Sequence, residues 1–372
     1  MKKIILIFIL ALMLINSIAF AEEEYIEPFI EKAIVLEAGE AEHSDDLYED
    51  IQMQEVKLKI ISGKYKGKIV DIENHLSDND AYNIFVVKGD KVVVVIEENN
   101  GEYHNTYISD YQRADYMVYL TILFIALILL IGKIKGLKAI ISLVLTVGSV
   151  FYILLPQILK GADPIPISIL ISIGVTIITI FLVSGINAKS IAAILGTSAG
   201  VIIAGLISYY IGLKIHLTGL SAEEATMLMY IPQGIEFDFK NLLFSGIILG
   251  SLGAVMDVGM SIASAIEEIH NVNNNLTRKE LFSSGMSVGK DIMGTMTNTL
   301  ILAYTGSSIP LLLLFMAYEI SLVEIMNLDV IATEVIRSLS GSIGLVLTIP
   351  ITALITSILI KKRKSNGEIS NE

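Results

Sequence analysis

The sequence contains no cysteine, so a disulfide framework, a thiolate metal site and a cysteine nucleophile are all excluded. Its five histidines, at positions 43, 75, 104, 216 and 270, form no His-Glu-x-x-His pair, which argues against a zinc hydrolase. A Walker motif, a Gly-x-Ser-x-Gly elbow and a Rossmann fingerprint are also missing. We therefore expect no cofactor and no metal.

Positive charge is scarce in the first third of the chain. Residues 22–116 contain 23 Asp and Glu against 9 Lys and Arg, and the whole chain has a net charge of −13, so the remainder is close to neutral. An acidic module of this kind argues against nucleic acid and anionic lipid as partners. Cations or a basic protein segment remain open as partners, and an acidic surface that serves only solubility is the plainer alternative.

Apolar residues are abundant. They make up 53% of the chain, and the mean hydropathy is +0.68, which indicates a polytopic membrane protein. Residues 1–21 have two lysines, an apolar core and the sequence Ala19-Phe20-Ala21, as in a signal peptide cleaved after Ala21. An uncleaved first helix is the alternative. Either reading makes residues 22–116 extracytoplasmic in a plasma-membrane protein.

The segment 22–116 alternates apolar and polar residues with a period of two, which is typical of half-buried strands. Short turns rich in Gly, Asn and Asp separate these runs. We expect a small β-barrel or sandwich. The expected strands are Val56–Ile60, Lys68–Ile72, Asn83–Val87 and Val92–Ile96.

Residues 117–360 form the expected multi-pass transmembrane domain, with seven to eight helices. The apolar runs are Met117–Ile131, Leu137–Leu155, Ile165–Val183, Ile191–Leu213, Leu242–Ile262, Ile292–Thr305, Pro310–Met326 and Ile343–Ile360. Eight full crossings would leave the basic tail, residues 361–372, outside, although such clusters prefer the cytoplasm. A re-entrant or broken segment at about residues 291–308 would place this tail inside. A missed or tilted helix elsewhere is the alternative.

Two polar strings interrupt the apolar runs. In a helix, Gly250, Gly253, Asp257, Ser261, Ser264 and Glu268 share one face, because they recur every three or four residues. Asp291, Thr295 and Asn298 repeat this spacing in the next segment. If these faces meet, they line a cavity suited to a dehydrated cation or a proton relay. The alternative is that the Ser, Thr and Gly residues only let helices approach each other closely.

Three ionisable residues lie within or next to the later apolar runs. Glu319 lies within an apolar run, so we expect it to turn inward. Asp291 is placed at a helix N-terminus, where a capping role and a functional role are equally open. Arg337 precedes the last apolar run and is expected to extend toward the membrane interface.

Three stretches resemble the YibE/F family of bacterial multi-pass membrane proteins. They are Gly253-Ala-Val-Met-Asp-Val-Gly-Met-Ser-Ile-Ala-Ser-Ala-Ile, Ser284-Gly-Met-Ser-Val-Gly-Lys-Asp-Ile-Met-Gly-Thr-Met-Thr-Asn-Thr-Leu-Ile-Leu-Ala-Tyr and Arg337-Ser-Leu-Ser-Gly-Ser-Ile-Gly-Leu-Val-Leu. The resemblance implies an extracytoplasmic domain ahead of the spans. It implies no catalytic or binding residues.

We interpret the chain as a permease or channel-like transporter for a small ion or solute, embedded in the lipid bilayer. Asp257 is its expected central charge, with Ser261, Ser264, Thr295 and Asn298 as polar lining. The alternative is a structural or accessory protein whose segment 22–116 binds an envelope protein. An intramembrane aspartyl protease is disfavoured because the residues before Asp257 do not match the Gly-x-Gly-Asp pattern, so we expect no enzymatic activity.

Overall fold

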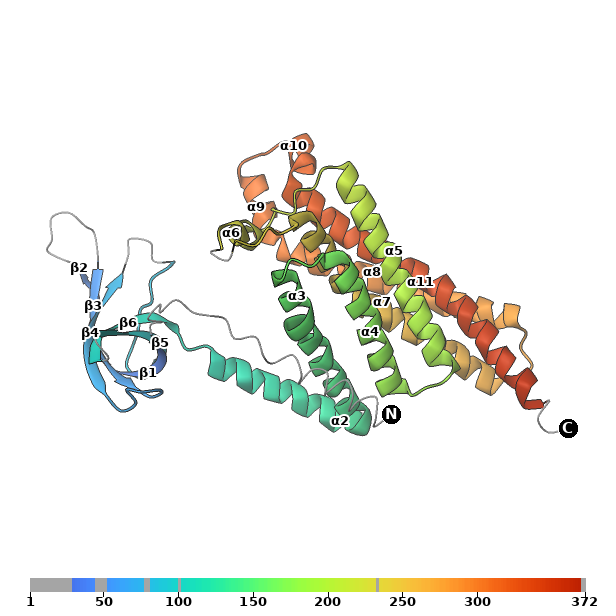
Figure 1. Ribbon diagram of the computed structural model, residues 1–372, viewed down its shortest axis with the longest axis horizontal. Helices are drawn as coiled ribbons and strands as arrows, with labels where there is room; N and C mark the ends of the chain where they lie inside the picture. The colour runs from blue at the N-terminus through green and yellow to red at the C-terminus, as the bar shows by residue number, and fades with distance from the viewer. Residues whose placement is uncertain (1–28, 44–51, 77–80, 100–101, 232–233, 369–372) are drawn as a thin grey trace. The chain divides into compact units, whose positions relative to one another are not determined.

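The computed structural model describes residues 29–43, 52–76, 81–99, 102–231 and 234–368 (Figure 1). The expected signal peptide, residues 1–21, lies outside this described part. The chain divides into two compact units with their boundary between Leu127 and Ile128. The first contains a β domain and the beginning of a long helix, and the second contains the remaining helices.

Six antiparallel strands form one sheet in the described part of the first unit. The strands are β1 (Phe29–Ala38), β2 (Glu42–His43), β3 (Gln52–Ile60), β4 (Ile69–Leu76), β5 (Lys91–Asn99) and β6 (Glu102–Tyr111). The pairing runs β4-β3-β1-β5-β6, and the short β2 also pairs with β3. Strands β4 and β6 are neighbours in space, so five strands make a nearly closed barrel. An N-terminal β domain is therefore confirmed.

The barrel interior follows the alternation of the sequence. Val56, Leu58 and Ile60 of β3 are buried, whereas Glu55 and Lys59 are exposed. This is the pattern expected of a strand with one face toward the core. The interior is completed by side chains from β1, β4 and β5, chiefly Ala33, Val35, Val70, Val92, Val94 and Ile96.

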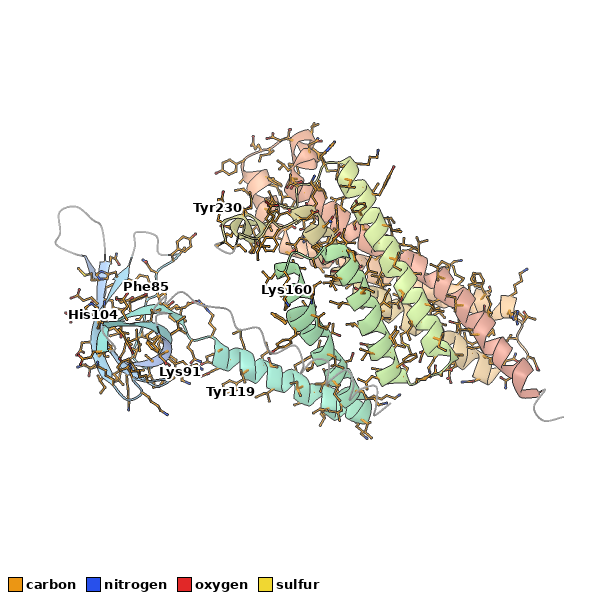
Figure 2. The ribbon with its side chains drawn as sticks, in the orientation of Figure 1. Phe85, Lys91, His104, Tyr119, Lys160 and Tyr230 are labelled. Atoms are coloured by element: carbon orange, nitrogen blue, oxygen red, sulfur yellow. The ribbon has the colours of Figure 1, made fainter. Side chains whose placement is uncertain are left out.

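The predicted strand Asn83–Val87 is wrong, because these residues make no strand ladder. Side chains of β3 and β4 form hydrogen bonds with some of the backbone groups of this segment instead. The Gln54 amide nitrogen donates to the Val86 carbonyl at 2.9 Å, and the Val86 N–H donates to the Gln54 amide oxygen at 3.2 Å. The Asn74 amide donates to the carbonyl of Ile84 at 2.8 Å. Phe85, labelled in Figure 2, belongs to this extended segment. Strands β1 and β6 were not among the predicted strands.

We predict that Gln54→Leu destabilises the barrel by about 2 to 4 kcal/mol, because it leaves backbone groups of the buried Val86 and of Gly39 unpaired. Gln52→Leu is the matched control, since it makes the same change in the same strand. The readout is amide hydrogen exchange of buried strand residues such as Leu58. Equal loss of protection in the two variants would contradict this assignment.

Helices account for most of the second unit. The longer ones are α2 (Ala114–Ser149), α4 (Pro164–Ser184), α5 (Ala188–Lys214), α7 (Phe239–Val272), α8 (Arg278–Ser307) and α11 (Asp329–Glu368). The shorter ones are the π-helix η1 (Val150–Leu154), α3 (Leu155–Leu159), α6 (Glu223–Met227), the 3₁₀-helix η2 (Leu228–Tyr230), α9 (Ile309–Ala317) and α10 (Leu322–Asn327). Five helical segments are long and apolar enough to cross a membrane, or six if the bent pair α8 and α9 forms one span.

The first of these segments, Ala114–Leu159, has 46 residues and would be about 69 Å long if it were straight. A bilayer core is only about 30 Å thick. The segment breaks at Lys133, where the backbone has φ 48° and ψ −124°. Each arm is therefore close to one membrane thickness, which agrees with the two separate runs seen in the sequence.

The region after α7 differs from the predicted one. Helix α8 begins at Arg278 with a Thr277/Glu280 capping box, so Asp291 lies in the middle of a helix and not at an N-terminus. The expected break falls later, after Ser307, where α8 and α9 meet at 59° and Pro310 occupies the first turn of α9. Proline lacks the N–H that a continuous helix needs. The run Pro310–Met326 is divided between α9 and α10 and is not one span.

The last helix is also longer than expected. The sequence places the final span at Ile343–Ile360, but α11 begins at Asp329 and continues to Glu368. Part of the expected basic tail is thus helical. Helix α11 packs against α5, α7 and α8, and α4 packs against α5 and α7. Figure 1 shows these helices as one bundle.

Glycines let α5, α7 and α11 approach closely. A methyl group at Gly200 would lie 2.9 Å from both the Gly344 carbonyl oxygen of α11 and a Val255 methyl of α7, and would collide with Thr348. A methyl group at Gly259 would lie 2.6 Å from the Thr197 hydroxyl. Small residues at such crossings are the main means by which membrane helices pack.

We predict that Gly200→Ala lowers the free energy of unfolding by about 1 to 3 kcal/mol, because the backbone has no room for the added methyl. Gly246→Ala in α7 is the control, since nothing lies within 4 Å of the added carbon. That change is expected to be neutral or slightly stabilising. Unfolding of the detergent-solubilised protein by titration with a denaturing detergent measures both, and similar losses would refute the close approach.

Candidate functional site

The depth of each residue in the bundle follows from the contacts between α5, α7 and α11. Gly200, Val255 and Gly344 each lie within about one residue of the midpoint of their spans, and they meet at one level. That level marks the middle of the bundle. Asp257 lies two residues beyond Val255, or about 3 Å along the helix. Its backbone is therefore close to mid-depth, far inside the half-thickness of about 15 Å of a bilayer core.

Asp257 lies on the exposed side of α7. We call Gly250, Gly253, Asp257, Ser261, Ser264 and Glu268 the α7 stripe. Ser264 is half-buried and the other five residues are exposed within the single chain. The opposite side of the helix, with Val255, Val258, Ile262 and Ile266, is at most 1% exposed. The shared face predicted from the spacing exists, but it points away from the packed core of the chain.

The α7 stripe plays little part in the close packing of the helices. Gly253 has nothing within 4 Å of an added methyl, whereas Gly259 and Gly200 are tightly enclosed. Thr348 and Thr352 of α11, which approach glycines of α5, are fully buried. Two different sets of small and polar residues are thus present, and the second set makes the close approaches among α5, α7 and α11.

Helix α8 runs antiparallel to α7. Methyl groups at Gly285 and Gly289 would meet Ile266 and Ile262 in turn, and one at Gly250 would lie 3.1 Å from the Tyr304 hydroxyl. Asp291 is therefore about 7 Å from mid-depth, and Asn298 is near the level of Asp257.

Asp291, Thr295 and Asn298 form the α8 stripe, and all three are exposed. The Thr295 hydroxyl donates to the Ile292 carbonyl of its own helix at 3.0 Å. Among the described residues, no hydrogen bond joins this stripe to the α7 stripe. The residues of the α8 stripe and most of those of the α7 stripe are therefore on the surface of the single chain.

Glu319 is not deep in a helix as expected. It lies between α9 and α10 with φ 50°, a backbone conformation that is uncommon outside glycine, and it is exposed. Helix α9 ends two residues earlier, and Ser321 caps α10 by accepting a hydrogen bond from the Glu324 N–H at 3.2 Å. Glu319 therefore belongs to a turn and is separate from both stripes.

A charged cluster near one end of the stripes was missed. The Arg337 guanidinium and the Glu334 carboxylate of α11 form an ion pair at 2.6 Å. The same guanidinium lies 6.0 Å from the centre of the Tyr304 ring of α8, whose hydroxyl is next to Gly250. The i, i+3 spacing of Glu334 and Arg337 is a usable signal, but the expected late start of α11 concealed it.

A second ion pair lies toward the other end of the bundle. The Lys189 ammonium at the start of α5 is 2.6 Å from the Glu267 carboxylate near the end of α7. Both side chains are 24% exposed. Glu267 is about 18 Å from mid-depth, which is beyond the apolar core of a bilayer. This pair therefore marks a polar boundary of the bundle and lies next in sequence to Glu268 of the α7 stripe.

Within the described residues, no group of three His, Asp or Glu side chains is arranged to hold a metal ion. The available chemistry along the stripes is that of carboxylates, hydroxyls and an amide. Such groups can replace part of the hydration shell of a small polar solute or relay a proton.

The comparisons with known families agree with this two-part construction. A model described as YibE/F-like protein matches residues 120–362, and one described as YibE/F family N-terminal domain matches residues 30–111. The chain belongs to the YibE/F family. The resemblance drawn from its motifs is thus confirmed. Neither the curated proteins nor the solved structures contain a match to this YibE/F protein.

We predict that Arg337→Met destabilises the YibE/F protein by about 1 to 3 kcal/mol, because it leaves the partly buried Glu334 carboxylate without its partner. The double variant Glu334→Gln/Arg337→Met is expected to recover most of that loss, since no charge is then unpaired. Denaturing-detergent titration of the three proteins provides the comparison. A double variant that is as unstable as Arg337→Met alone would contradict the cost assigned to the unpaired Glu334 carboxylate.

Proposed function

We propose that the YibE/F protein is a permease or channel-like transporter for a small ion or solute, with the α7 and α8 stripes lining its path. One observation carries this proposal: Asp257 is at mid-depth and is left uncovered by its own chain. A carboxylate there is costly against hydrocarbon, by at least about 2.5 kcal/mol. The uncovered face is therefore expected to border water or another polar surface.

The small residues that pack the helices are different from those of the two stripes, which supports a solute path along the stripes. Gly200, Gly259 and Gly344 already provide the close approaches. The exposed Ser261, Thr295 and Asn298 are not needed for them. Their hydroxyl and amide groups are instead available to a passing solute, with Asp257 as the central charge and Asp291 as a second carboxylate.

Charged and polar groups continue the series toward both ends of the bundle. Tyr304 lies beside Gly250, Arg337 and Glu334 follow it toward that end of the bundle, and the Lys189–Glu267 pair lies near the opposite end. Asp257 and Asp291 are between them. A solute that follows α7 would thus meet a polar group at each stage of the crossing.

Seven crossings fit this arrangement. The two arms of α2, then α4, α5, α7, the bent pair α8 and α9, and α11 each cross once. With the β domain outside, an odd number of crossings places the basic end of α11 in the cytoplasm. Arg278 and Lys189 are then also cytoplasmic, as the positive-inside rule requires. The plasma-membrane location and the extracytoplasmic β domain are part of the same proposal.

The competing function is that of an accessory membrane protein whose β domain binds an envelope partner. In that case the stripes would be dry contacts with other membrane helices, and Asp257 would serve assembly. The two functions differ in whether water reaches the stripes and whether solute crosses the membrane.

A flux measurement tests the role of Asp257. We expect Asp257→Asn to reduce solute flux into proteoliposomes by about tenfold or more. The flux is measured by light scattering after a salt or solute gradient has been imposed. Glu324→Gln is the control, because it removes one exposed carboxylate that belongs to neither stripe. We expect that control to retain flux. Equal flux in the wild type and Asp257→Asn would overturn the central role of this charge.

A cysteine scan supplies the complementary test, since the natural chain has no cysteine. We expect Ser261→Cys and Asn298→Cys to react with a membrane-impermeant thiol reagent. Leu206→Cys on α5, whose side chain is 62% exposed on an apolar helix, is expected to stay protected by lipid. Protection at all three positions in a stably inserted protein would rule out a water-filled path and favour the accessory function.

A further inference from the structure

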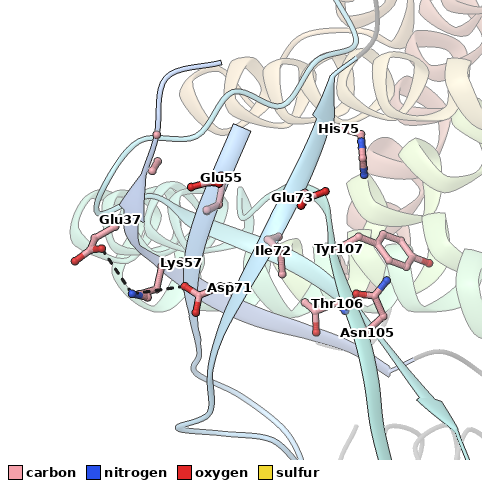
Figure 3. Close-up of a pocket in the computed structure, with 13 residues that line it drawn as sticks. Glu37, Glu55, Lys57, Asp71, Ile72, Glu73, His75, Asn105, Thr106 and Tyr107 are labelled. Carbon is pink, nitrogen blue, oxygen red and sulfur yellow. Dashed lines mark hydrogen bonds and ion pairs between the residues drawn. The ribbon is translucent and has the colours of Figure 1, made fainter. Parts of the chain in front are cut away.

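The β domain contains an open cleft of about 800 Å³, which is within the range of specific ligand sites (Figure 3). Residues from β1, β3, β4 and β6 line it. Its polar lining is made chiefly by Glu37, Glu55, Lys57, Asp71, Glu73 and His75, with Asn105, Thr106 and Tyr107 on the β6 side. The transport proposal uses none of these residues.

The cleft lies where the barrel is not closed. Among the described strands, β4 pairs only with β3, and β6 pairs only with β5. Figure 3 shows Asn105 and Thr106 of β6 beside Ile72 of β4. Each of these strands therefore has one edge whose backbone N–H and C=O groups are not used by a ladder. Such edges are sites at which another extended chain can add.

The charges beside this seam are unbalanced. Lys57 is shared between Glu37, at 3.8 Å, and Asp71, at 3.6 Å. Glu55 and Glu73 are direct cross-strand partners, and both are exposed. Like charges at such a position destabilise a sheet, because their side chains start only about 5 Å apart. No ion pair with either carboxylate is present in the described part of the chain, so a cation from outside would relieve the repulsion.

An unused hydrogen-bonding group lies in the same cleft. Thr106 is only 3% exposed, and its hydroxyl has no hydrogen-bond partner among the described residues. Buried polar groups in proteins are almost always paired. A hydroxyl in the lining of an open seam is suited to donate to, or accept from, a chain that enters it. This observation is independent of the acidic charge.

A single metal ion does not explain these features. Within the described residues, no three acidic or histidine side chains converge as metal ligands. The negative charge is instead spread along two strands, Glu55 of β3 and Asp71 and Glu73 of β4. A ligand with several positive charges at strand spacing matches this distribution better than one compact ion does.

We propose that the cleft binds an extended, lysine- or arginine-bearing segment of another protein, which adds as a strand between β4 and β6. Its backbone hydrogen-bonds to the free edges of these strands. Its basic side chains, repeating every second residue, face Glu55, Glu73 and Asp71. The Thr106 hydroxyl contributes a further hydrogen bond. This binding does not depend on transport, so the two proposals can fail separately.

The test uses the full-length protein in detergent and a fluorescent peptide of about ten residues in which Lys alternates with Val. We expect saturable binding that weakens as salt rises from about 50 mM to about 300 mM. The double variant Glu55→Gln/Glu73→Gln should weaken binding by about tenfold or more. The matched control is Glu223→Gln/Glu224→Gln in α6, which removes two exposed carboxylates outside the cleft.

Two measurements separate strand addition from simple charge attraction. Peptide binding should slow amide hydrogen exchange in β4 and β6, and a peptide with proline in place of every Val should bind weakly, because proline donates no backbone hydrogen bond. The proposal would be overturned if a Glu-Val peptide bound as tightly as the Lys-Val peptide. It would also be overturned if the Glu55→Gln/Glu73→Gln variant bound the Lys-Val peptide as tightly as the wild type does. Binding without added protection of β4 and β6 would overturn the strand geometry.

The same variant also reports on folding. Thermal unfolding of Glu55→Gln/Glu73→Gln should be unchanged or shifted slightly upward, since the repulsion between the two carboxylates is removed. Weak peptide binding in a variant of unchanged stability then identifies loss of recognition. A variant that unfolds at a lower temperature would contradict the inference that this pair is strained in the absence of a ligand.

Discussion

The close approach of α5, α7 and α11 is the constraint on which the rest of the membrane part depends. Lipid tails are as apolar as leucine, so helices in a membrane gain little from hydrophobic burial and depend on packing contacts. Gly200 and Gly344 provide these contacts at one level, and Gly259 provides another about one helical turn away. Because α7 must turn Gly259 and Val255 toward its neighbours, the side that carries Asp257 is turned outward. The position of the central charge thus follows from the position of the glycines.

This constraint separates residues that look alike in the sequence. Thr197 and Thr348 are fully buried between helices, whereas Thr295 is on an exposed surface. The first two fill space beside glycines, and the third is available to a ligand or to solvent. Serine, threonine and glycine are common in membrane helices for either reason. The burial of each residue, and not its type, decides which role it has here.

The β domain shows a related use of side chains where a strand is missing. Gln54 and Asn74 hold the segment around Val86 with hydrogen bonds that a ladder would otherwise make. The neighbouring seam between β4 and β6 has no such substitute in the described residues. One gap in the sheet is thus completed by the chain itself, and the other is left with free edges, an unpaired hydroxyl and two facing carboxylates.

Local sequence patterns were sufficient for much of the architecture. Alternation in Val56–Ile60 predicted β3, the short β-branched run Val92–Ile96 predicted β5, and long apolar runs predicted the membrane helices. Asn83–Val87 contains a similar apolar run but makes no ladder, and side chains of β3 and β4 bond to its backbone instead. The beginnings of α8 and α11 were missed because charged and small polar residues interrupt their N-terminal halves. Hydropathy identifies segments that can contact lipid, and it does not mark where a helix begins.

The sequence alone determined that Asp257, Ser261 and Ser264 share a helix face, because that depends only on 3.6 residues per turn. It also determined the excess negative charge of the β domain. Only the tertiary structure decided that this face points out of the bundle, that Asp291 lies within a helix, and that Glu55 faces Glu73 across two strands. These relations depend on which distant segments pack together, and local periodicity carries no information about that choice.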